Sequence, residues 1–296
     1  STSCSGAVAA NYTFTYVAGA VTITPATVTV TASSHTVTYG DAVPTITASF
    51  SGFKNSETSA VLTTQPTCTT AYTVTSNAGS TPSTSCSGAA AVNYTFTYTA
   101  GAVTINKATV SVTASSPTVT YADPIPTITA TFGAFKNGES SSVLTTQPTC
   151  TTAYTTSSNA GSSPATSCSG AAATNYTFTY TPGAVTVNKA TSTTVVTCPV
   201  SVTYNGAAQT PCSATVTGVG GLNQSVTVTY GSNTNAGTAS AAATFAGDTN
   251  HTGSNDSKMF DILKAAVTAT AGGGTSPYDG AAKSPSACVV RGAFIG

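Results

Sequence analysis

Apolar and polar residues alternate along most of this chain. In segment 26–32, Val28, Val30 and Ala32 fall on one face and threonines on the other. In segment 93–98, Tyr, Phe and Tyr alternate with Thr in the same way, and we expect these aromatic side chains to lie in a core. A period of two residues is typical of strands with one buried face. Since no segment has a convincing helical period, we predict an all-β chain.

Turn signals separate the predicted strands. Gly, Asn, Asp and Ser are the residues that tight turns favour. They recur between the alternating segments at Ser33-Ser34, Gly40-Asp41, Lys54-Asn55, Asn77-Ala78-Gly79 and Ala100-Gly101. Several short strands within about 80 residues are typical of a β-sandwich of the immunoglobulin-like kind.

The chain is a repeat array. The hexad Asn-Tyr-Thr-Phe-Thr-Tyr begins at Asn11, Asn93 and Asn175, at intervals of 82 residues. A Lys-Ala pair recurs between strands and marks the boundaries. We therefore predict incomplete repeats at 1–25 and 265–296, complete repeats at 26–107 and 108–189, and a variant repeat at 190–264. The connecting segments are short, which favours an elongated rod of tandem sandwiches over freely moving domains.

The two incomplete repeats call for a complement. Residues 1–25 correspond to the C-terminal part of a repeat, and residues 265–296 to the N-terminal part. Partial sandwiches expose strand edges and apolar faces. We expect either flanking repeats of the same polypeptide, or the ends of other copies joined head to tail, to complete them.

Eight cysteines follow the repeat pattern. Equal spacing in two repeats indicates an intradomain disulfide in each, worth about 3 kcal/mol in the chain-entropy model. The expected pairs are Cys68 with Cys86, Cys150 with Cys168, and Cys198 with Cys212. Structural disulfides indicate an oxidising, extracellular compartment. Zinc binding is the alternative, and the absence of any CxxC and the presence of two histidines argue against it.

Two cysteines have no partner by this pattern. Cys4 aligns with Cys86 and Cys168, so its partner would precede the chain. Cys288 has no evident partner within 265–296. A disulfide outside this segment, or one between Cys288 and Cys4 of neighbouring copies, is the expectation for both.

Composition narrows the functional classes. Charged residues are 5% of the chain, against about 25% in a typical soluble domain. Eight basic and eight acidic side chains balance, so no basic face for nucleic acid is expected. No apolar run approaches the roughly 20 residues of a membrane helix. Nothing in the sequence calls for a cofactor.

The two histidines are weak catalytic candidates. His35 aligns with Pro117 of the next repeat, so the fold does not need it. His251 lies in a polar turn, where a solvated loop histidine is expected. A Ser-His-Asp set cannot be assembled within a repeat from so few histidines, and we predict that the chain is not an enzyme.

The acidic residues are scattered. Asp41 and Asp123 are equivalent and are interpreted as turn residues. Calcium binding by Asp248, Asp256 and nearby carbonyls is a minor alternative, because calcium takes six to eight oxygen ligands. A Lys–Asn isopeptide crosslink needs a buried lysine beside an acid, whereas the recurring lysines lie in polar loops.

Six sequons fit N-glycosylation, which requires an exposed Asn in Asn-x-Ser/Thr. Such sequences are frequent by chance in a Thr-rich chain, and an Asn that simply begins a strand is the competing interpretation. The candidate sites are Asn11, Asn93, Asn175, Asn223, Asn250 and Asn255.

The motifs of one repeat, taken in order, resemble a known family. They are the Lys-Ala junction, Tyr-Gly-Asp, Ser-Gly-Phe-Lys-Asn, Val-Leu-Thr-Thr-Gln-Pro-Thr-Cys, Cys-Ser-Gly and the hexad. This run resembles the MBG-type (Tyr-Gly-X) repeats of bacterial surface adhesins. Segment 190–264 resembles a bacterial immunoglobulin-like repeat, through Tyr204-Asn-Gly, Cys212, Leu222-Asn-Gln, the Asn-Ala-Gly at Asn235 and the Ala-Gly-Asp at Ala246. The resemblance implies extracellular surface β-rods without catalytic residues. Ala122 stands where the pattern has Gly, so that position should tolerate a Cβ.

These observations predict an extracellular structural protein, a stalk or head-to-tail filament at a bacterial surface. Its expected partners are copies of itself or flanking repeats. One alternative is an adhesin whose repeats bind a glycan or protein ligand, which a cluster of exposed tyrosines outside the hexads would favour. Another is an accessory module of a secreted enzyme, which would need an attached domain with paired acids.

Overall fold

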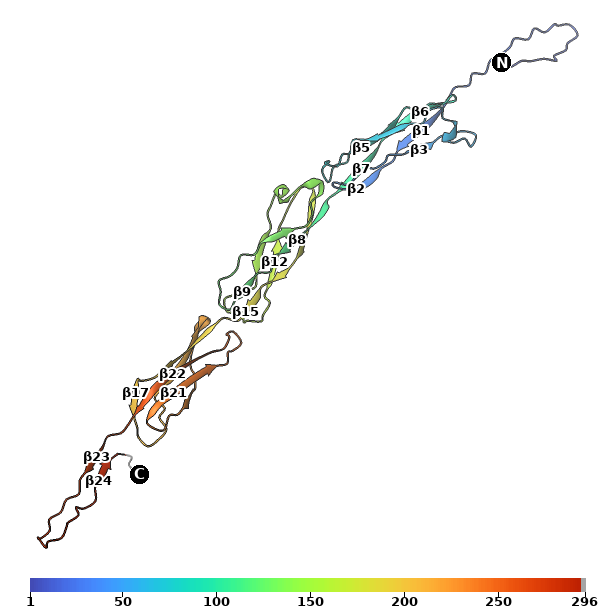
Figure 1. Cartoon of the computed structure of the whole chain (residues 1–296). Helices are drawn as coiled ribbons and strands as arrows, with labels where there is room; N and C mark the ends of the chain where they lie inside the picture. Colours follow the sequence, from blue (N-terminus) through green and yellow to red (C-terminus); the bar gives the residue numbers. More distant parts are fainter. Residues whose placement is uncertain (294–296) are drawn as a thin grey trace. The chain divides into compact units, whose positions relative to one another are not determined.

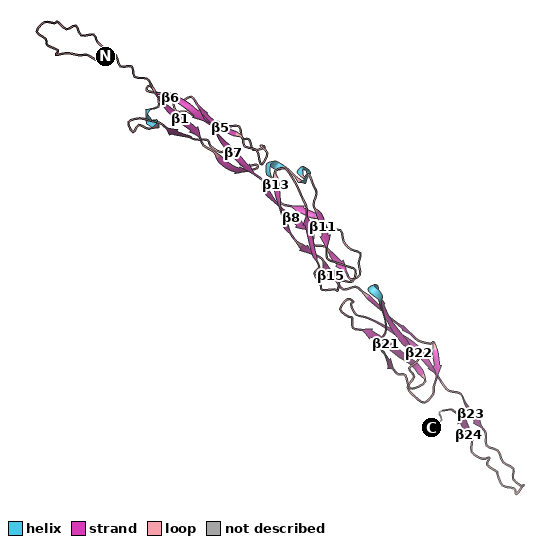
Figure 2. Cartoon of the chain, turned by 180° about the vertical axis from the view of Figure 1, so that it is seen from behind, coloured by secondary structure: helices cyan, strands magenta, loops and turns pink. Residues whose placement is uncertain are grey.

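The computed structural model describes residues 1–293. Strand and loop make up almost all of this part of the chain, and its helical residues are confined to short 3-10 turns (Figure 2). The prediction of an all-β fold of tandem sandwich repeats is confirmed. None of the described helices is long and apolar enough to cross a membrane.

Contacts divide the chain into two compact units. Unit 1 holds Ser1–Val112, Thr131–Thr149 and Ser169–Tyr180. Unit 2 holds Thr113–Ala130, Cys150–Cys168 and Thr181–Gly296. Each unit therefore joins one end of the second repeat to the neighbouring domain, and each contains one domain junction.

The first repeat, in unit 1, forms two sheets whose strands can be followed in Figure 1. In hydrogen-bonding order they are β3 (Ala48–Ser51), β1 (Ala26–Ala32) and β6 (Tyr94–Thr99), and then β2 (His35–Thr38), β7 (Gly101–Asn106), β5 (Ser83–Ser87) and β4 (Thr67–Thr70). A 3-10 turn, η1 (Ser59–Val61), precedes β4. The first strand pairs in parallel with the hexad strand β6, and β2 pairs in parallel with β7.

The second repeat has the same plan, shared between the two units. Its strands form the sets β10 (Ala130–Phe132), β8 (Ala108–Ala114), β13 (Tyr176–Thr181); β11 (Thr149–Thr152), β12 (Ala165–Ser169), β14 (Gly183–Ala184); and β15 (Thr186–Asn188), β9 (Thr118–Thr120). The 3-10 turns η2 (Lys136–Gly138) and η3 (Ser141–Val143) lie between β10 and β11.

The third domain, in unit 2, merges the last two strands of the plan into one long strand. Its sheets are β16 (Ser192–Thr197), β18 (Ser213–Gly218), β19 (Leu222–Ser225), and β17 (Ser201–Thr203), β22 (Ser254–Leu263), β21 (Gly237–Phe245), β20 (Val228–Gly231), with the turn η4 (Val219–Gly221). The parallel bridge Ala190↔His251 and the parallel pairing of β17 with β22 preserve both parallel contacts of the repeats.

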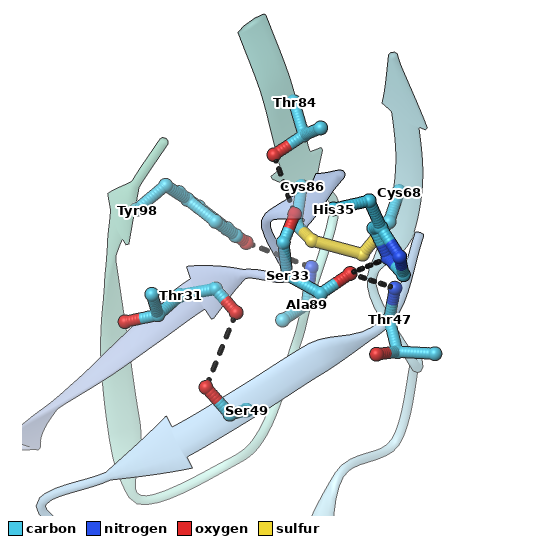
Figure 3. The surroundings of a disulfide bond; sticks show 10 residues. All are labelled: Thr31, Ser33, His35, Thr47, Ser49, Cys68, Thr84, Cys86, Ala89 and Tyr98. Carbon is cyan, nitrogen blue, oxygen red and sulfur yellow. Dashed lines mark hydrogen bonds between the residues drawn. A yellow bond between two sulfur atoms is a disulfide. The ribbon is translucent and has the colours of Figure 1, made fainter. Parts of the chain in front are cut away.

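Alternating burial follows the predicted faces. Val28 and Val30 are fully buried, and Tyr94 at the start of the hexad is 8% exposed. Tyr98 at the end of the hexad is 41% exposed, so the expectation of a fully buried aromatic face is wrong there. The Tyr98 hydroxyl instead accepts the Ala89 N–H at 2.8 Å and holds the preceding loop against the strand (Figure 3).

The left-handed turn after β2 accounts for the Tyr-Gly-X motif. Gly40 has φ +80° in the first repeat, and Ala122 has φ +67° at the same place in the second. A Cβ in this region costs roughly 1–2 kcal/mol. Ala122 is tolerated, as predicted, with backbone strain that Gly40 avoids.

Three disulfides are present, which confirms the expectation of disulfide bonding. Cys68 and Cys86 lie directly opposite each other on β4 and β5, with Cα atoms 4.0 Å apart (Figure 3). The bond therefore links neighbouring strands of one sheet. The other two join Cys150 to Cys168 and Cys198 to Cys212. Cys4 and Cys288 are exposed free thiols.

Residues 1–25 repeat the β5–β7 segment without forming its strands. The isolated bridge Thr2↔Gly19 corresponds to the Thr84↔Gly101 pairing of the first repeat. The Tyr16 hydroxyl accepts the Ala7 N–H at 2.7 Å, as Tyr98 does with Ala89. The apolar side chains stay exposed, with Val8 at 94% and Ile23 at 90%.

The C-terminal segment forms one antiparallel pair, β23 (Val267–Thr270) with β24 (Val289–Gly292). Thr268 pairs with Arg291, just as Thr29 pairs with Ser51 at the start of the first repeat. Every residue of both strands is exposed. The segment thus has the first antiparallel pairing of a sandwich without the strands that would cover it.

Removing the first disulfide should destabilise the first repeat. A Cys68→Ser/Cys86→Ser variant should lose about 3 kcal/mol of unfolding free energy, because an 18-residue cross-link no longer restricts the unfolded chain. Denaturant unfolding followed by tyrosine fluorescence measures the loss. Cys4→Ser, at an exposed free thiol, is the control; equal effects of the two variants would contradict the prediction.

Candidate functional site: the domain junctions

The residues first considered for chemistry have structural partners. The Asp41 and Asp123 carboxylates accept the N–H groups of Thr38 and Thr120, which confirms them as turn residues. His35 lies 2.9 Å from the Ser33 hydroxyl (Figure 3). Within residues 1–293, no three His, Cys, Asp or Glu side chains gather into a metal-binding group. Polar side chains converge instead where one domain follows another.

In unit 1, the hexad Asn of the second repeat, Asn175, forms hydrogen bonds to a loop of the first repeat; we call this contact the clasp. Asn175 Oδ1 accepts the Ala78 N–H at 3.0 Å, and Asn175 Nδ2 donates to Asn77 Oδ1 at 3.1 Å. The backbone holds Asn175 in position, because its carbonyl accepts the N–H of Ala108, the first residue of β8, at 3.0 Å. The oxygen and the nitrogen of the Asn175 side-chain amide therefore both bond to the first repeat.

Beside the clasp, one carboxylate joins two tyrosines. Tyr39 donates to Glu139 Oε1 at 2.7 Å and Tyr176 donates to Glu139 Oε2 at 2.5 Å. The two rings pack edge to face, 5.5 Å apart at 79°. Burial, and then the hydrogen bond to Glu139, raises the pKa of both hydroxyls. Each Tyr is 3% exposed, so both rings are buried, whereas the Glu139 that joins them is half-buried.

Apolar packing crosses the same boundary. A single buried cluster includes Tyr39, Tyr72, Val103 and Ile105 of the first repeat together with Ala108, Val110, Ala173 and Tyr176 of the second. A shared core of this kind resists separation of the two faces, because parting them would expose apolar surface to water.

At the rim, Lys136 Nζ lies 3.1 Å from Asp41 Oδ1, with the two side chains 44% and 41% exposed. An exposed pair of this kind contributes up to about 1 kcal/mol. Asn137 Nδ2 donates to the Val74 carbonyl at 3.0 Å. Lys136 is therefore an exposed ion-pair partner and lacks the burial that isopeptide chemistry requires.

Unit 2 repeats the clasp at the entry to the third domain. Asn250 Oδ1 accepts the Ala160 N–H at 2.9 Å, and Asn250 Nδ2 donates to Asn159 Oδ1 at 3.1 Å. The Asn250 carbonyl accepts the Ala190 N–H at 2.8 Å. These contacts match those of Asn175, so the same device serves two different domain types.

His251 takes the place of Tyr176 in the second junction. Its ring packs edge to face on Tyr121, 5.4 Å apart at 79°. Nδ1 lies 3.0 Å from both Asp248 carboxylate oxygens, and Nε2 lies 3.0 Å from the Val219 carbonyl oxygen. Burial opposes ionisation of Asp248, but hydrogen bonds from His251 and from backbone N–H groups outweigh it and lower the Asp248 pKa.

The expectation that His251 is a solvated loop residue is wrong, since its exposure is 4%. The polar sequence around it suggested a free loop. The available signal was the shared order Asn-aromatic-Thr at Asn175 and Asn250, which sequence reasoning treated as a sequon. The amides of Asn175 and Asn250 are engaged in the junctions, and glycosylation at the six sequons stays a prediction.

Comparison with known families identifies the repeats. Residues 28–104 and 110–186, just over half of the chain, match the MBG domain (YGX type). The chain belongs to the MBG domain (YGX type) family. MBG repeats are non-catalytic modules that point to a tandem-repeat surface or adhesin-type protein. No curated protein matches the chain. The tyrosine that begins the Tyr-Gly-X motif lies at a domain junction in both repeats. Tyr39 packs against Tyr176, and Tyr121 packs against His251.

Substituting the same Asn in two different repeats distinguishes a role at the junction from a role within the repeat. Asn175→Ala should cost about 1–3 kcal/mol, because it leaves the Ala78 N–H without its acceptor. Asn93→Ala, the same residue of the first repeat, should change stability by less than about 0.5 kcal/mol. Urea unfolding of the full chain measures both. Equal losses would mean that the Asn supports its own repeat and not the junction.

Acid should weaken the turn that Asp41 stabilises, together with its ion pair at the first junction. The Thr38 N–H first, and then Lys136, holds the pKa of Asp41 below its ordinary value of 3.8. The carboxylate's contribution is therefore fully present above about pH 4 and is lost as the pH falls through the folded-state pKa. The stability deficit of Asp41→Asn relative to wild type should be present at pH 6 and shrink as the pH falls through the lowered pKa of Asp41. A deficit that is constant with pH would contradict this assignment.

Proposed function

We propose that this chain is an extracellular, non-catalytic structural protein, a segment of a stalk or filament at a bacterial surface. The observation that carries the proposal is the repeated clasp. Asn175 and Asn250 each fix an Asn-Ala-Gly loop of the preceding domain with two hydrogen bonds of closely similar length. A chain whose domains are docked to each other in this way transmits force and orientation from one domain to the next.

The composition supports the proposed location. Three disulfides suit an oxidising compartment. Few charges and abundant Ser and Thr give a neutral polar surface, with no patch for nucleic acid. The MBG family supports a surface protein in the same sense.

An adhesin with a ligand site in its repeats is less well supported. Such a site would need exposed aromatic side chains gathered outside the hexads. Within residues 1–293, Tyr278 is the strongly exposed tyrosine outside the hexads, at 97%. The other exposed tyrosines belong to the hexads, where Tyr98 and Tyr180 hold adjacent loops. No specific contact therefore favours a ligand-binding role.

Domain coupling can be measured directly. In the full chain, residual dipolar couplings should report the same alignment tensor for neighbouring domains, because the junctions hold these domains together. An Asn175→Ala/Asn250→Ala variant should show separate alignment of each domain, with each domain still folded. Asn223→Ala/Asn255→Ala, at two exposed asparagines outside the junctions, is the matched control and should behave as wild type. Independent alignment already in the wild-type chain would overturn the proposed stalk function.

A further inference from the structure

The two junctions are stabilised by different chemistry. At the first, Tyr176 belongs to a buried apolar cluster with members from both repeats. At the second, Tyr121 packs against a buried cluster whose members all belong to the second repeat. Among the described residues, Asp123 forms no salt bridge, whereas its counterpart Asp41 forms one. The second junction therefore depends more on polar contacts, and the buried His251 is the residue at which they meet.

Both ring nitrogens of His251 face atoms that accept hydrogen bonds. Nδ1 lies 3.0 Å from each carboxylate oxygen of Asp248, and Nε2 lies 3.0 Å from the Val219 carbonyl oxygen. A neutral imidazole has one N–H and can satisfy one of these partners, whereas an imidazolium has two and satisfies both. Turning the ring by 180° would place carbon atoms against both partners, so it offers no alternative. The arrangement therefore fits the protonated form of His251.

The charged groups around the ring are arranged to accept a positive charge. Burial opposes ionisation of Asp248, but hydrogen bonds from His251 and from backbone N–H groups outweigh it and lower the pKa of Asp248. Lys189, the neighbouring cation, donates to the backbone carbonyl of Asp248 and leaves both carboxylate oxygens to other donors. The 3-10 turn η4 has no ionisable side chain, and the second repeat contributes the ring of Tyr121.

The His251 ring also holds together the surface that Tyr121 contacts. It joins the turn at Asp248 to η4 through the Val219 carbonyl. Tyr121 packs edge to face on His251 and lies directly against Gly220 of η4, where an added Cβ would be 2.4 Å from the Tyr121 ring. The position of η4, and with it the fit of Tyr121, therefore depends on the bond from Nε2.

We infer that protonated His251 assembles the surface of the third domain that receives the second repeat, and that this junction loosens when His251 loses a proton. This regulation rests on the proposed stalk function. A single remaining N–H stays with the Asp248 carboxylate, which is the stronger acceptor, and the Val219 carbonyl loses its donor. The charged form stabilises the junction, so its contribution is present at low pH and is lost as the pH rises. Histidines change charge between about pH 5 and 8.

The first junction should not respond in this pH range. Burial, and then the hydrogen bond to Glu139, raises the pKa of Tyr39 and Tyr176. A turn N–H, and then a lysine, lowers the pKa of Asp41. These three groups therefore keep their charge between about pH 5 and 8. The other histidine of the chain, His35, is bonded within the first repeat.

Two NMR measurements on the full chain test the inference. The ring-nitrogen signals of His251 should show protons on both nitrogens at about pH 5.5 and loss of the Nε2 proton toward about pH 8. Residual dipolar couplings should report one alignment tensor for the second repeat and the third domain at the lower pH and two at the higher. The midpoint should match that of the ring titration. The first and second repeats should share a tensor throughout.

Two variants separate His251 from other titrating groups. His251→Gln keeps a polar side chain but cannot carry the charge, so the third domain should stay folded and align independently at both pH values. His35→Gln, at the other histidine, is the matched control and should respond to pH as wild type does.

The outcomes distinguish this inference from the proposed function. A singly protonated His251 ring at about pH 5.5, or a common tensor that persists to about pH 8, would overturn the inference and leave the stalk function standing. A pH response that survives in His251→Gln would do the same. Independent alignment of the wild-type domains already at the lower pH would overturn the stalk function, and the inference with it.

Discussion

The parallel pairing of the first strand of each domain with a strand near its end is the constraint on which the rest of this structure depends. Because that pairing starts at the linker, with the Ala108 N–H on the Asn175 carbonyl and the Ala190 N–H on the Asn250 carbonyl, the entry point of a domain also contains the start of its hexad strand or of the corresponding strand. The Asn side chain there projects against the domain that came before. One backbone pairing thus builds the sandwich and places the clasp.

Some of the few charged residues of the chain lie at the two domain junctions. Six of the sixteen charged side chains lie at the two junctions, namely Lys107, Lys136, Lys189, Asp41, Glu139 and Asp248. Most of the remaining surface relies on Ser and Thr hydroxyls. These six side chains contribute contacts between neighbouring domains, and the interior of each sandwich depends on alternating Val, Ala and aromatic side chains with one disulfide.

Sequence reasoning predicted the features that local pattern and spacing determine. Period-two alternation located Val28 and Val30 in a core, and cysteine spacing predicted disulfide bonding. It could not see that Asn175 and Asn250 reach another domain, because a contact with a loop about 90 residues away leaves no local periodicity. His251 was misinterpreted for the same reason: its ring packs against Tyr121, which lies on a different domain. Alternation alone also does not reveal that Tyr98, near the end of its strand, binds the loop before the strand.

Each of the three complete domains has an Asn-Ala-Gly loop, beginning at Asn77, Asn159 and Asn235. Each also has an Asn at the position that binds such a loop, namely Asn93, Asn175 and Asn250. Duplication of one 82-residue segment in the gene would therefore create a new domain that already fits both of its neighbours. The length of such an array can change by whole repeats without any compensating substitution. The length of the array becomes a heritable quantity that unequal recombination can adjust, independently of the stability of any single domain.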